Sequence, residues 1–293
     1  MQTRPIENFA QAQRERLAFI EFRLWFLGDI SRRDLMERFG IAPAMATRDL
    51  AAYRELAPGN IDFEGSRKIY VTGPDFSPLF EHPPERVLSA LSKGFGEGTS
   101  EAARGYLPFE SPMRLNRPAL PVLAIISRAI HQQKAVGVKY HSLKRGPGKR
   151  EIIPHALVDS GLRWHVRAYD RGFAQFRDLV LSRIEAPVLQ ADALVEEHEL
   201  PGSDDQWTKI ITLELVPHPN HAWKDIVARD FGMTKGKLTL KVRAAVAGYL
   251  LRLWNVDCSA DQHLAPAIHR LWLRNNDVLC GVTSAEIAPG ADG

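Results

Sequence analysis

Four runs of β-branched and aromatic residues between positions 136 and 184 constrain the fold of this chain more than any other feature. They read V-G-V-K-Y-H-S-L from Val136, R-E-I-I-P-H-A-L-V from Arg150, R-W-H-V-R-A-Y-D from Arg163 and F-R-D-L-V-L-S-R-I from Phe176. Gly, Pro or Asp bounds each run, which is typical of β-strands joined by turns. The sequence therefore predicts a small β-sheet in the middle of the chain.

The third run has two different faces, because side chains alternate along a strand. The face expected to join a hydrophobic core carries Trp164, Val166 and Ala168. The other face carries Arg163, His165, Arg167 and Tyr169. We therefore expect one side of the sheet to present cations and an aromatic ring.

Positive charge is concentrated around these runs. Residues 128–183 contain twelve Lys or Arg and four Asp or Glu, a net charge of +8, whereas the whole chain carries only +3 and the other segments together carry −5. Such a concentration on a small sheet predicts an anion-binding surface. Nucleic acid or a phosphate-bearing ligand is the natural candidate for it.

The first 75 residues predict a winged helix-turn-helix. Apolar residues with a period near 3.6 indicate a helix over Arg14–Leu27. Ser31, with an acidic residue three positions later, is placed to cap a second helix that ends at Gly40. A third helix is expected over Pro43–Leu56, because proline suits the first turn of a helix, where its missing N–H would have no partner. Two short strands, Asn60–Phe63 and Lys68–Thr72, would then form the wing.

Contacts with DNA are expected from the third helix and from basic positions beside it. A recognition helix offers its N-terminal residues to the major groove, so the expected base contacts are Thr47 and Arg48, with Ala44 as a further exposed position of the DNA-binding face. The expected phosphate contacts are Ser31, Arg32, Arg33, Arg67 and Lys68. Net charge gives no support, since residues 1–75 hold eleven basic and eleven acidic residues. A three-helix cluster with a hairpin that does not bind DNA is the alternative.

The residues of the four runs resemble a WYL domain, a small Sm-like β-barrel module found in bacterial regulators. The resemblance rests on Tyr140-His141-Ser142, Pro154-His155-Ala156-Leu157-Val158, Arg163 to Asp170 and Leu181-Ser182-Arg183-Ile184. Trp164-His165-Val166 stands where the module has its Trp-Tyr-Leu run, so a histidine replaces the middle aromatic residue. The whole chain is similar to the WYL regulators that lie beside phage-defence operons of the BREX and CBASS types.

This resemblance implies a ligand site on the sheet. Carried over by position, the ligand-facing residues of the family are Tyr140, Ser142, His155, Arg167 and Arg183, to which we add His165 and Arg177. Arginine suits this role because its planar fork matches carboxylate and phosphate. Alternatives remain: Tyr140 could be a barrel residue with a bonded hydroxyl, His155 could cap a turn, and the cations between Lys144 and Arg150 could be solvated.

The remaining segments are expected to connect the domains and to join protomers. Residues 76–132 are expected to be a linker and helical connector, with a helix over Pro121–Gln132 leading into the first strand. The C-terminal third resembles the extension of WYL regulators, called WCX-type, that mediates dimer contact. Its expected elements are strands over Trp207–Val216 and Lys237–Val242, and helices over His221–Phe231, Ala244–Asn255 and Leu264–Arg274.

Large apolar residues in this C-terminal third offer a surface for dimer contact, with an ordinary internal core as the alternative. They are Tyr249, Leu250, Leu253, Trp254, Leu271 and Trp272.

Enzymatic chemistry is not expected. His141, His155 and His165 invite a nuclease interpretation with histidine as general acid or base. However, the sheet region has no acidic cluster for a divalent metal, and the sequence has no phosphate loop or nucleophile elbow. We therefore expect no cofactor and no metal. With no membrane-spanning run, no signal peptide and only two cysteines, the expected setting is the reduced cytoplasm.

The expected fold class is α+β, in four parts. A winged helix-turn-helix (1–75) and a connector (76–132) precede an Sm-like β-barrel of the WYL type (133–190) and a small α/β dimerisation domain (205–285). The expected function is a homodimeric DNA-binding regulator that represses a phage-defence or stress operon. A nucleic-acid fragment or nucleotide-like anion would bind the WYL domain. The alternative is a non-regulatory accessory protein that grips single-stranded nucleic acid by stacking and charge.

Overall fold

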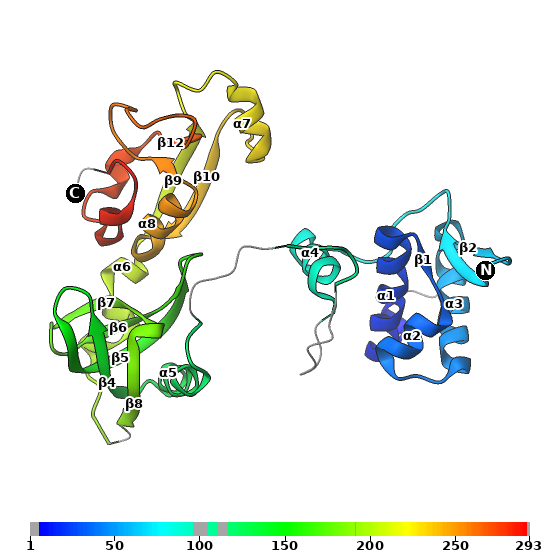
Figure 1. Cartoon of the computed structure of the whole chain (residues 1–293), viewed down its shortest axis with the longest axis horizontal. Coiled ribbons are helices and arrows are strands. Elements are labelled where there is room, and N and C mark those ends of the chain that lie inside the picture. The colour runs from blue at the N-terminus through cyan, green and yellow to red at the C-terminus, as the bar shows by residue number, and fades with distance from the viewer. Residues whose placement is uncertain (1–5, 96–104, 111–116, 191, 292–293) are drawn as a thin grey trace. The chain divides into compact units, whose positions relative to one another are not determined.

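The chain forms two compact units, residues 1–111 and 112–293. The structure is a computed structural model that describes residues 6–95, 105–110, 117–190 and 192–291, and Figure 1 draws these as ribbons. The second unit contains two domains, here called the central domain (residues 120–190) and the C-terminal domain (residues 205–291).

The first unit is a winged helix-turn-helix, as predicted. Its helices are α1 (Gln11–Leu27), α2 (Arg32–Phe39), α3 (Pro43–Leu56) and α4 (Pro84–Lys93). Its sheet has the order β1-β3-β2, formed by β1 (Asp29–Ile30), β2 (Ile61–Glu64) and β3 (Ile69–Thr72). Ser31 caps α2 in a complete capping box with Asp34. The two-residue strand β1 was not predicted, because it follows Gly28 directly and is too short to show a pattern.

A buried carboxylate joins three parts of this unit. Glu21 on α1 is fully buried and accepts hydrogen bonds from the Tyr53 hydroxyl of α3 (2.9 Å) and from the amides of Leu79 and Phe80 (2.8 and 2.9 Å). His82 Nε2 lies 3.0 Å from the same carboxylate. The chain that leaves the wing is therefore fixed to the helix that is expected to read DNA.

The stretch expected to be a connector packs against both units. Phe76, Leu79, Phe80, Phe95 and Tyr106 pack against the core of the first unit. In the second unit, α5 (Leu120–Gln132) packs its buried residues Ile126 and Ala129 onto the central sheet. Most of the expected glycine-rich stretch 94–100 and of the loop 111–118 lies outside the described residues.

The central domain is a five-stranded antiparallel sheet with the order β7-β6-β5-β4-β8 (Figure 1). The strands are β4 (Ala135–Ser142), β5 (Gly146–Asp159), β6 (Trp164–Asp170), β7 (Gln175–Val180) and β8 (Ile184–Gln190). The fourth predicted run is divided, because a 3-10 turn at Leu181–Arg183 ends β7 and begins β8. Irregular register in β4 and β5 bends the sheet around its core.

The C-terminal domain packs helices on a four-stranded sheet with the order β10-β9-β12-β11. Its strands are β9 (Ile210–Pro217), β10 (Leu238–Arg243), β11 (Val256–Asp257) and β12 (Leu271–Leu273), and its helices are α6 (Asp205–Thr208), α7 (Lys224–Asp230) and α8 (Ala244–Leu253). The helix predicted over Leu264–Arg274 is wrong. Leu271 and Leu273 alternate with Trp272 in a strand between β9 and β11, so their period is two.

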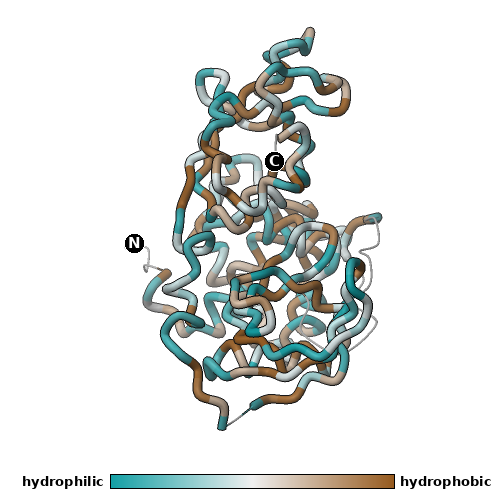
Figure 2. Tube along the Cα trace, turned by 90° about the vertical axis from the view of Figure 1, so that its left-hand side faces the viewer, coloured by the Kyte–Doolittle hydropathy of each residue, from teal (hydrophilic) through white to brown (hydrophobic). Residues whose placement is uncertain are grey.

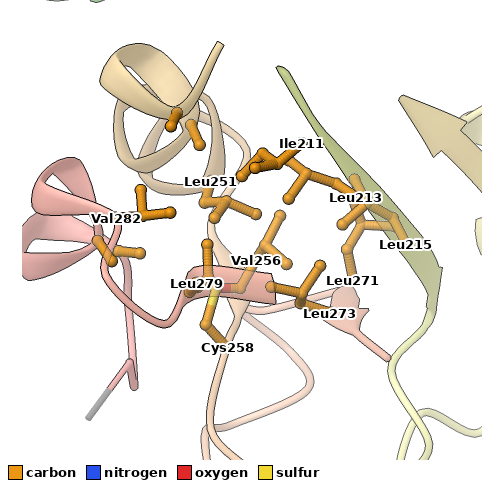
Figure 3. Packing of buried hydrophobic residues seen from close by; sticks show 14 of the residues in the cluster. Ile211, Leu213, Leu215, Leu251, Val256, Cys258, Leu271, Leu273, Leu279 and Val282 are labelled. Carbon is orange, nitrogen blue, oxygen red and sulfur yellow. The ribbon is translucent and has the colours of Figure 1, made fainter. Parts of the chain in front are cut away.

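The core of this domain is built from buried aliphatic residues of β9, α8, β11 and β12 (Figure 3). Cys258 belongs to it, and burial raises the pKa of its thiol to about 12. Hydrophobic and hydrophilic residues alternate at short intervals along the trace (Figure 2). Among the described residues, no helix has the length and apolar character needed to cross a membrane.

Candidate nucleic-acid interface and anion site

The N-terminal half of α3 presents a small exposed surface. Ala44, Thr47 and Arg48 are all exposed, as expected for residues that reach into a groove. The adjacent Asp49 is 1% exposed and points inward, where Arg16 Nε of α1 lies 2.6 Å from it. The carboxylate next to Arg48 is therefore neutralised internally, which leaves a positive charge on the outer face of the helix.

The residues expected to contact phosphate differ in whether an acidic side chain already pairs with them. Arg32 and Lys68 are exposed, and no ion pair is recorded for either within the described residues. Arg33 pairs with Glu37 at 2.5 Å, and Arg67 lies 3.5 Å from Glu64. The capping box uses the Ser31 hydroxyl and also the backbone amides of Ser31 and Asp34, so a phosphate at this helix start would have to bind the remaining amides of the first turn.

In the central domain, the side chain of Arg167 on β6 is buried and forms ion pairs with two carboxylates. Its Nε and Nη2 donate to the two oxygens of Asp204 at 2.7 and 2.9 Å, and its Nη1 donates to Asp178 on β7 at 3.2 Å. Arg167 and Asp204 are 4% and 1% exposed. His155 Nε2 of β5 lies 3.2 Å from Asp204, and the Tyr249 hydroxyl of α8 donates to Asp178 at 3.0 Å.

These contacts change the titration of the buried groups. Burial alone would raise the pKa of Asp204, but hydrogen bonds from His155 and Arg167 outweigh it and hold that pKa well below its ordinary value. For Arg167, burial opposes the charged form, yet the hydrogen bond to Asp204 and the charge of Asp178 raise the pKa of the guanidinium. Both residues of this pair are therefore charged at neutral pH.

The expectation that this face of β6 presents its cations to solvent is wrong. His165 and Arg167 are 6% and 4% exposed, because the segment before α6 and the helix α8 cover them. The ring of His165 lies 5.0 Å from that of Tyr249, and its buried Nδ1 has no hydrogen-bond partner among the described residues. Arg183 is half-buried near His165, and no ion pair is recorded for it among the described residues.

A second group of cations surrounds Phe173 in the turn between β6 and β7. The guanidinium carbons of Arg145, Arg150 and Arg177 lie 4.7, 4.9 and 4.1 Å from the centre of its ring. Arg150 also lies 4.8 Å above the ring of Tyr140 and donates to Asp170 at 2.6 Å. We call these four residues, Arg145, Arg150, Phe173 and Arg177, the Phe173 cluster.

The structure therefore divides the predicted ligand residues between two places. Tyr140 and Arg177 lie at the Phe173 cluster, whereas His155, His165 and Arg167 lie under the C-terminal domain. Ser142 ends β4, where its hydroxyl accepts from the amides of Lys144 and Arg145. The Tyr140 hydroxyl accepts from the Val180 amide at 3.2 Å, which is the bonded role weighed as the alternative.

Sequence reasoning did not assign Asp204, Asp178, Tyr249 or Phe173 to a ligand site, and it expected Tyr249 at the dimer surface. Asp204 lies in an acidic segment between Glu196 and Asp205, but nothing local joins it to Arg167 thirty-seven residues earlier.

The proposed apolar dimer surface is mostly interior. Leu271 is fully buried, and Leu250 and Trp254 pack against the core, so these residues follow the alternative of an ordinary core. Leu253 alone of the six is strongly exposed, at 53%. The large exposed apolar side chains of α7 and its start are instead Trp223 and Ile226, at 69% and 57%.

Three family models match successive parts of the chain. The BrxR transcriptional regulator winged helix-turn-helix domain matches residues 12–93, the WYL domain matches residues 121–189, and the BrxR transcriptional regulator C-terminal dimerization domain matches residues 210–279. Fold and matches together define a winged-helix transcriptional regulator with a WYL domain and a C-terminal dimerization domain, which confirms the predicted fold class.

Curated relatives identify the family. The DNA-binding transcriptional repressor CapW of Escherichia coli (strain KTE188) is 33% identical over 279 residues, which is 90% of this chain and 90% of that protein. CapW of Stenotrophomonas maltophilia is 33% identical, over 86% of this chain and 88% of its own, and CapW of Pseudomonas aeruginosa is 32% identical, over 90% of each. The chain belongs to the CapW family of WYL-domain repressors.

Among solved structures, proteasome accessory factor B/C (PafBC) of Arthrobacter aurescens shares 15% identity with a TM-score of 0.29. The match covers 93% of this chain and 46% of that one. This likeness is too low for a structural inference.

Proposed function

We propose that this chain is a homodimeric repressor that binds a palindromic operator through α3 and the wing. In this proposal a phosphate-bearing ligand, either a nucleic-acid fragment or a nucleotide, binds the WYL domain and releases the operator. The controlled genes are a phage-defence or stress operon. The observation that carries DNA binding is the exposed N-terminal face of α3, where Arg48 has no ion pair with any described residue while its acidic neighbour Asp49 is paired internally.

The Phe173 cluster supports the ligand. Three guanidinium groups lie within 5 Å of one ring centre, and within the described part of the chain they form one ion pair, that of Arg150 with Asp170. A group of three arginines with one carboxylate partner keeps a net positive charge that attracts phosphate oxygens, and arginine binds them through two parallel hydrogen bonds. Tyr140 and Ser142 contribute to the same ligand site, and Arg183, which lies near His165, adds a further positive charge.

A face of α7 supports the dimer. Trp223 and Ile226 are three positions apart and strongly exposed, and they lie in the domain matched by the dimerization model. A two-fold interface brings the same surface of both protomers together. Lys224 and Arg229 balance Asp225 and Asp230 on α7, so two antiparallel copies of this helix can pair opposite charges. We assign this face to a second copy of the chain.

Operator binding tests the first part of this proposal. Arg48→Ala should weaken binding to DNA from the protein's own upstream region by about 1–3 kcal/mol, which is the usual worth of a good base contact. Arg54→Ala removes the same charge from the exposed C-terminal half of α3 and is the matched control. Gel shifts at fixed salt measure both. Equal losses in the two variants would mean that α3 does not read the operator with its N-terminal half.

The alternative accessory function predicts a different result in the same assay. A protein that grips single strands by charge and stacking binds unrelated sequences alike, with a steep dependence on salt. The repressor instead forms a discrete complex with its own double-stranded upstream DNA. Indifference to sequence and preference for single strands would favour the accessory function.

A further inference from the structure

The Arg167–Asp204 pair has the geometry of an occupied anion site. We propose that the Asp204 carboxylate is an internal anion that holds the ligand-reading Arg167 in the free protein. A phosphate group entering the adjoining cavity displaces it and so detaches the C-terminal domain from the central sheet. This inference rests on the proposed function, because it names how ligand binding at the WYL domain is transmitted.

The donors around Asp204 form a buried site that already binds a carboxylate. Arg167 offers Nε and Nη2 in a fork to both carboxylate oxygens, and His155 Nε2 reaches one of them from a second strand. All three side chains are almost completely buried, with exposures of 1% to 4%. Carboxylate and phosphate share this bidentate geometry, so the same donors accept either group.

The cavity beside the Arg167–Asp204 pair and its charges favour a phosphate that replaces Asp204 over one that binds next to it. A cavity of about 780 Å³ borders Arg167 and Asp204, and its lining includes Arg177, Ser203 and Gln206. The same lining carries Asp178, Asp205 and Glu286. With four carboxylates against two arginines, an added anion is repelled while Asp204 stays in place. The anion is accepted only when Asp204 withdraws, because buried like charges strongly disfavour each other.

Asp204 is placed to transmit its own displacement. It is the N-cap of α6, where its side chain accepts from the Trp207 amide, and it belongs to the loop segment that leads into the C-terminal domain. The residue after α6, Lys209, accepts a backbone hydrogen bond from Ala244 at the start of α8. The Tyr249 hydroxyl of α8, which donates to Asp178 on β7, is a second polar contact between the C-terminal domain and the sheet.

Asp204→Asn tests this directly in the full-length dimer. Asparagine keeps the size of the side chain and its ability to cap α6, but it removes the negative charge. Asp205→Asn is the matched control, because it removes a charge from the same cavity at an exposed position with no contact to Arg167. Inorganic phosphate, a nucleoside monophosphate and a short single-stranded oligonucleotide are titrated by calorimetry, which distinguishes the sources of the phosphate.

We expect Asp204→Asn to bind at least one of these probes about tenfold more tightly than the natural chain, and to bind operator about tenfold more weakly without ligand. Asp205→Asn should change neither affinity by more than about twofold. Equal behaviour of the two variants in both assays overturns the inference. Probe binding that Asp204→Asn leaves unchanged also overturns it, while leaving the proposed ligand class intact.

A further outcome separates the ligand from the internal contact. If none of the probes binds any variant, yet Asp204→Asn alone weakens operator binding, the proposed ligand class is wrong. The role of Asp204 in holding Arg167 is then still supported. Should Asp204→Asn not fold, Tyr249→Phe serves as the second variant, since it removes only the hydrogen bond to Asp178. It should weaken operator binding in the same direction by a smaller factor. Unchanged operator binding in Tyr249→Phe would then overturn the inference.

Discussion

Burial sets the protonation state of His165, which lies in the middle of the WYL signature. Its ring lies against Tyr249, and its Nδ1 finds no partner in the described parts of the chain. Burial is the main cause that lowers its pKa below the ordinary 6.5; the charge of Asp178 opposes this shift, and those of Arg163 and Arg183 add to it. The folded chain therefore keeps this histidine neutral at a pH where the unfolded chain has begun to protonate it. The position of the tyrosine in the Trp-Tyr-Leu run is here filled by a neutral imidazole.

This shift gives stability a definite dependence on pH. Because the unfolded state binds the proton more readily, the unfolding free energy contributed by neutral His165 is present above pH about 6.5 and is lost as the pH falls toward the lower folded-state pKa. We expect His165→Gln to lose less stability than the natural chain between pH 7.5 and 5.5. His131→Gln, at an exposed position on α5, should leave the natural pH dependence in place. Urea denaturation at several pH values measures the difference.

The limit of sequence reasoning is visible at single residues. Strand alternation correctly put His165 and Arg167 on one face, because it follows from backbone geometry alone. It gave no information on what covers that face, since Asp204 and Tyr249 come from segments thirty-seven and more residues later. A local charge of +8 therefore suggested open cations, whereas the structure supplies a carboxylate for the most buried of them.

Elements were predictable where their signals are local. The boundaries of α3 agree with the prediction, because proline fixes its start and the apolar period is regular along it. Strand β8 and the strand over Leu271–Leu273 were missed, because a short apolar run has no period that separates strand from helix. Pairing with β9, which is remote in sequence, decided the second case.

The Glu21 network gives a test at the scale of elements. Glu21→Gln should lower the stability of the first unit by about 2 kcal/mol or more, since an amide has one oxygen where the carboxylate accepts from two backbone amides, Tyr53 and His82. Faster hydrogen exchange of the Leu79 and Phe80 amides would report the local opening. Glu55→Gln, which removes an exposed carboxylate from α3, is the control. Unaltered exchange in Glu21→Gln would mean that packing alone fixes the segment after the wing.

At the scale of the whole molecule, operator recognition requires two copies of the first unit, because a helix-turn-helix dimer reads two half-sites about one helical turn apart. The proposed contact through α7 makes this requirement measurable. Trp223→Ala combined with Ile226→Ala should raise the dimer dissociation constant by at least about thirtyfold, since truncation of a central aromatic anchor costs about 2 kcal/mol or more.

Sedimentation velocity over a range of protein concentrations measures this change, and Leu194→Ala supplies the control. Leu194 is 86% exposed but lies outside the C-terminal domain, so its truncation removes a comparable apolar side chain without touching α7. The double variant should also lose operator affinity at low protein concentration, where most of it is monomeric. It should regain this affinity at high concentration, because mass action restores the dimer. A monomer–dimer equilibrium that is identical in all three proteins would assign the dimer contact to another face.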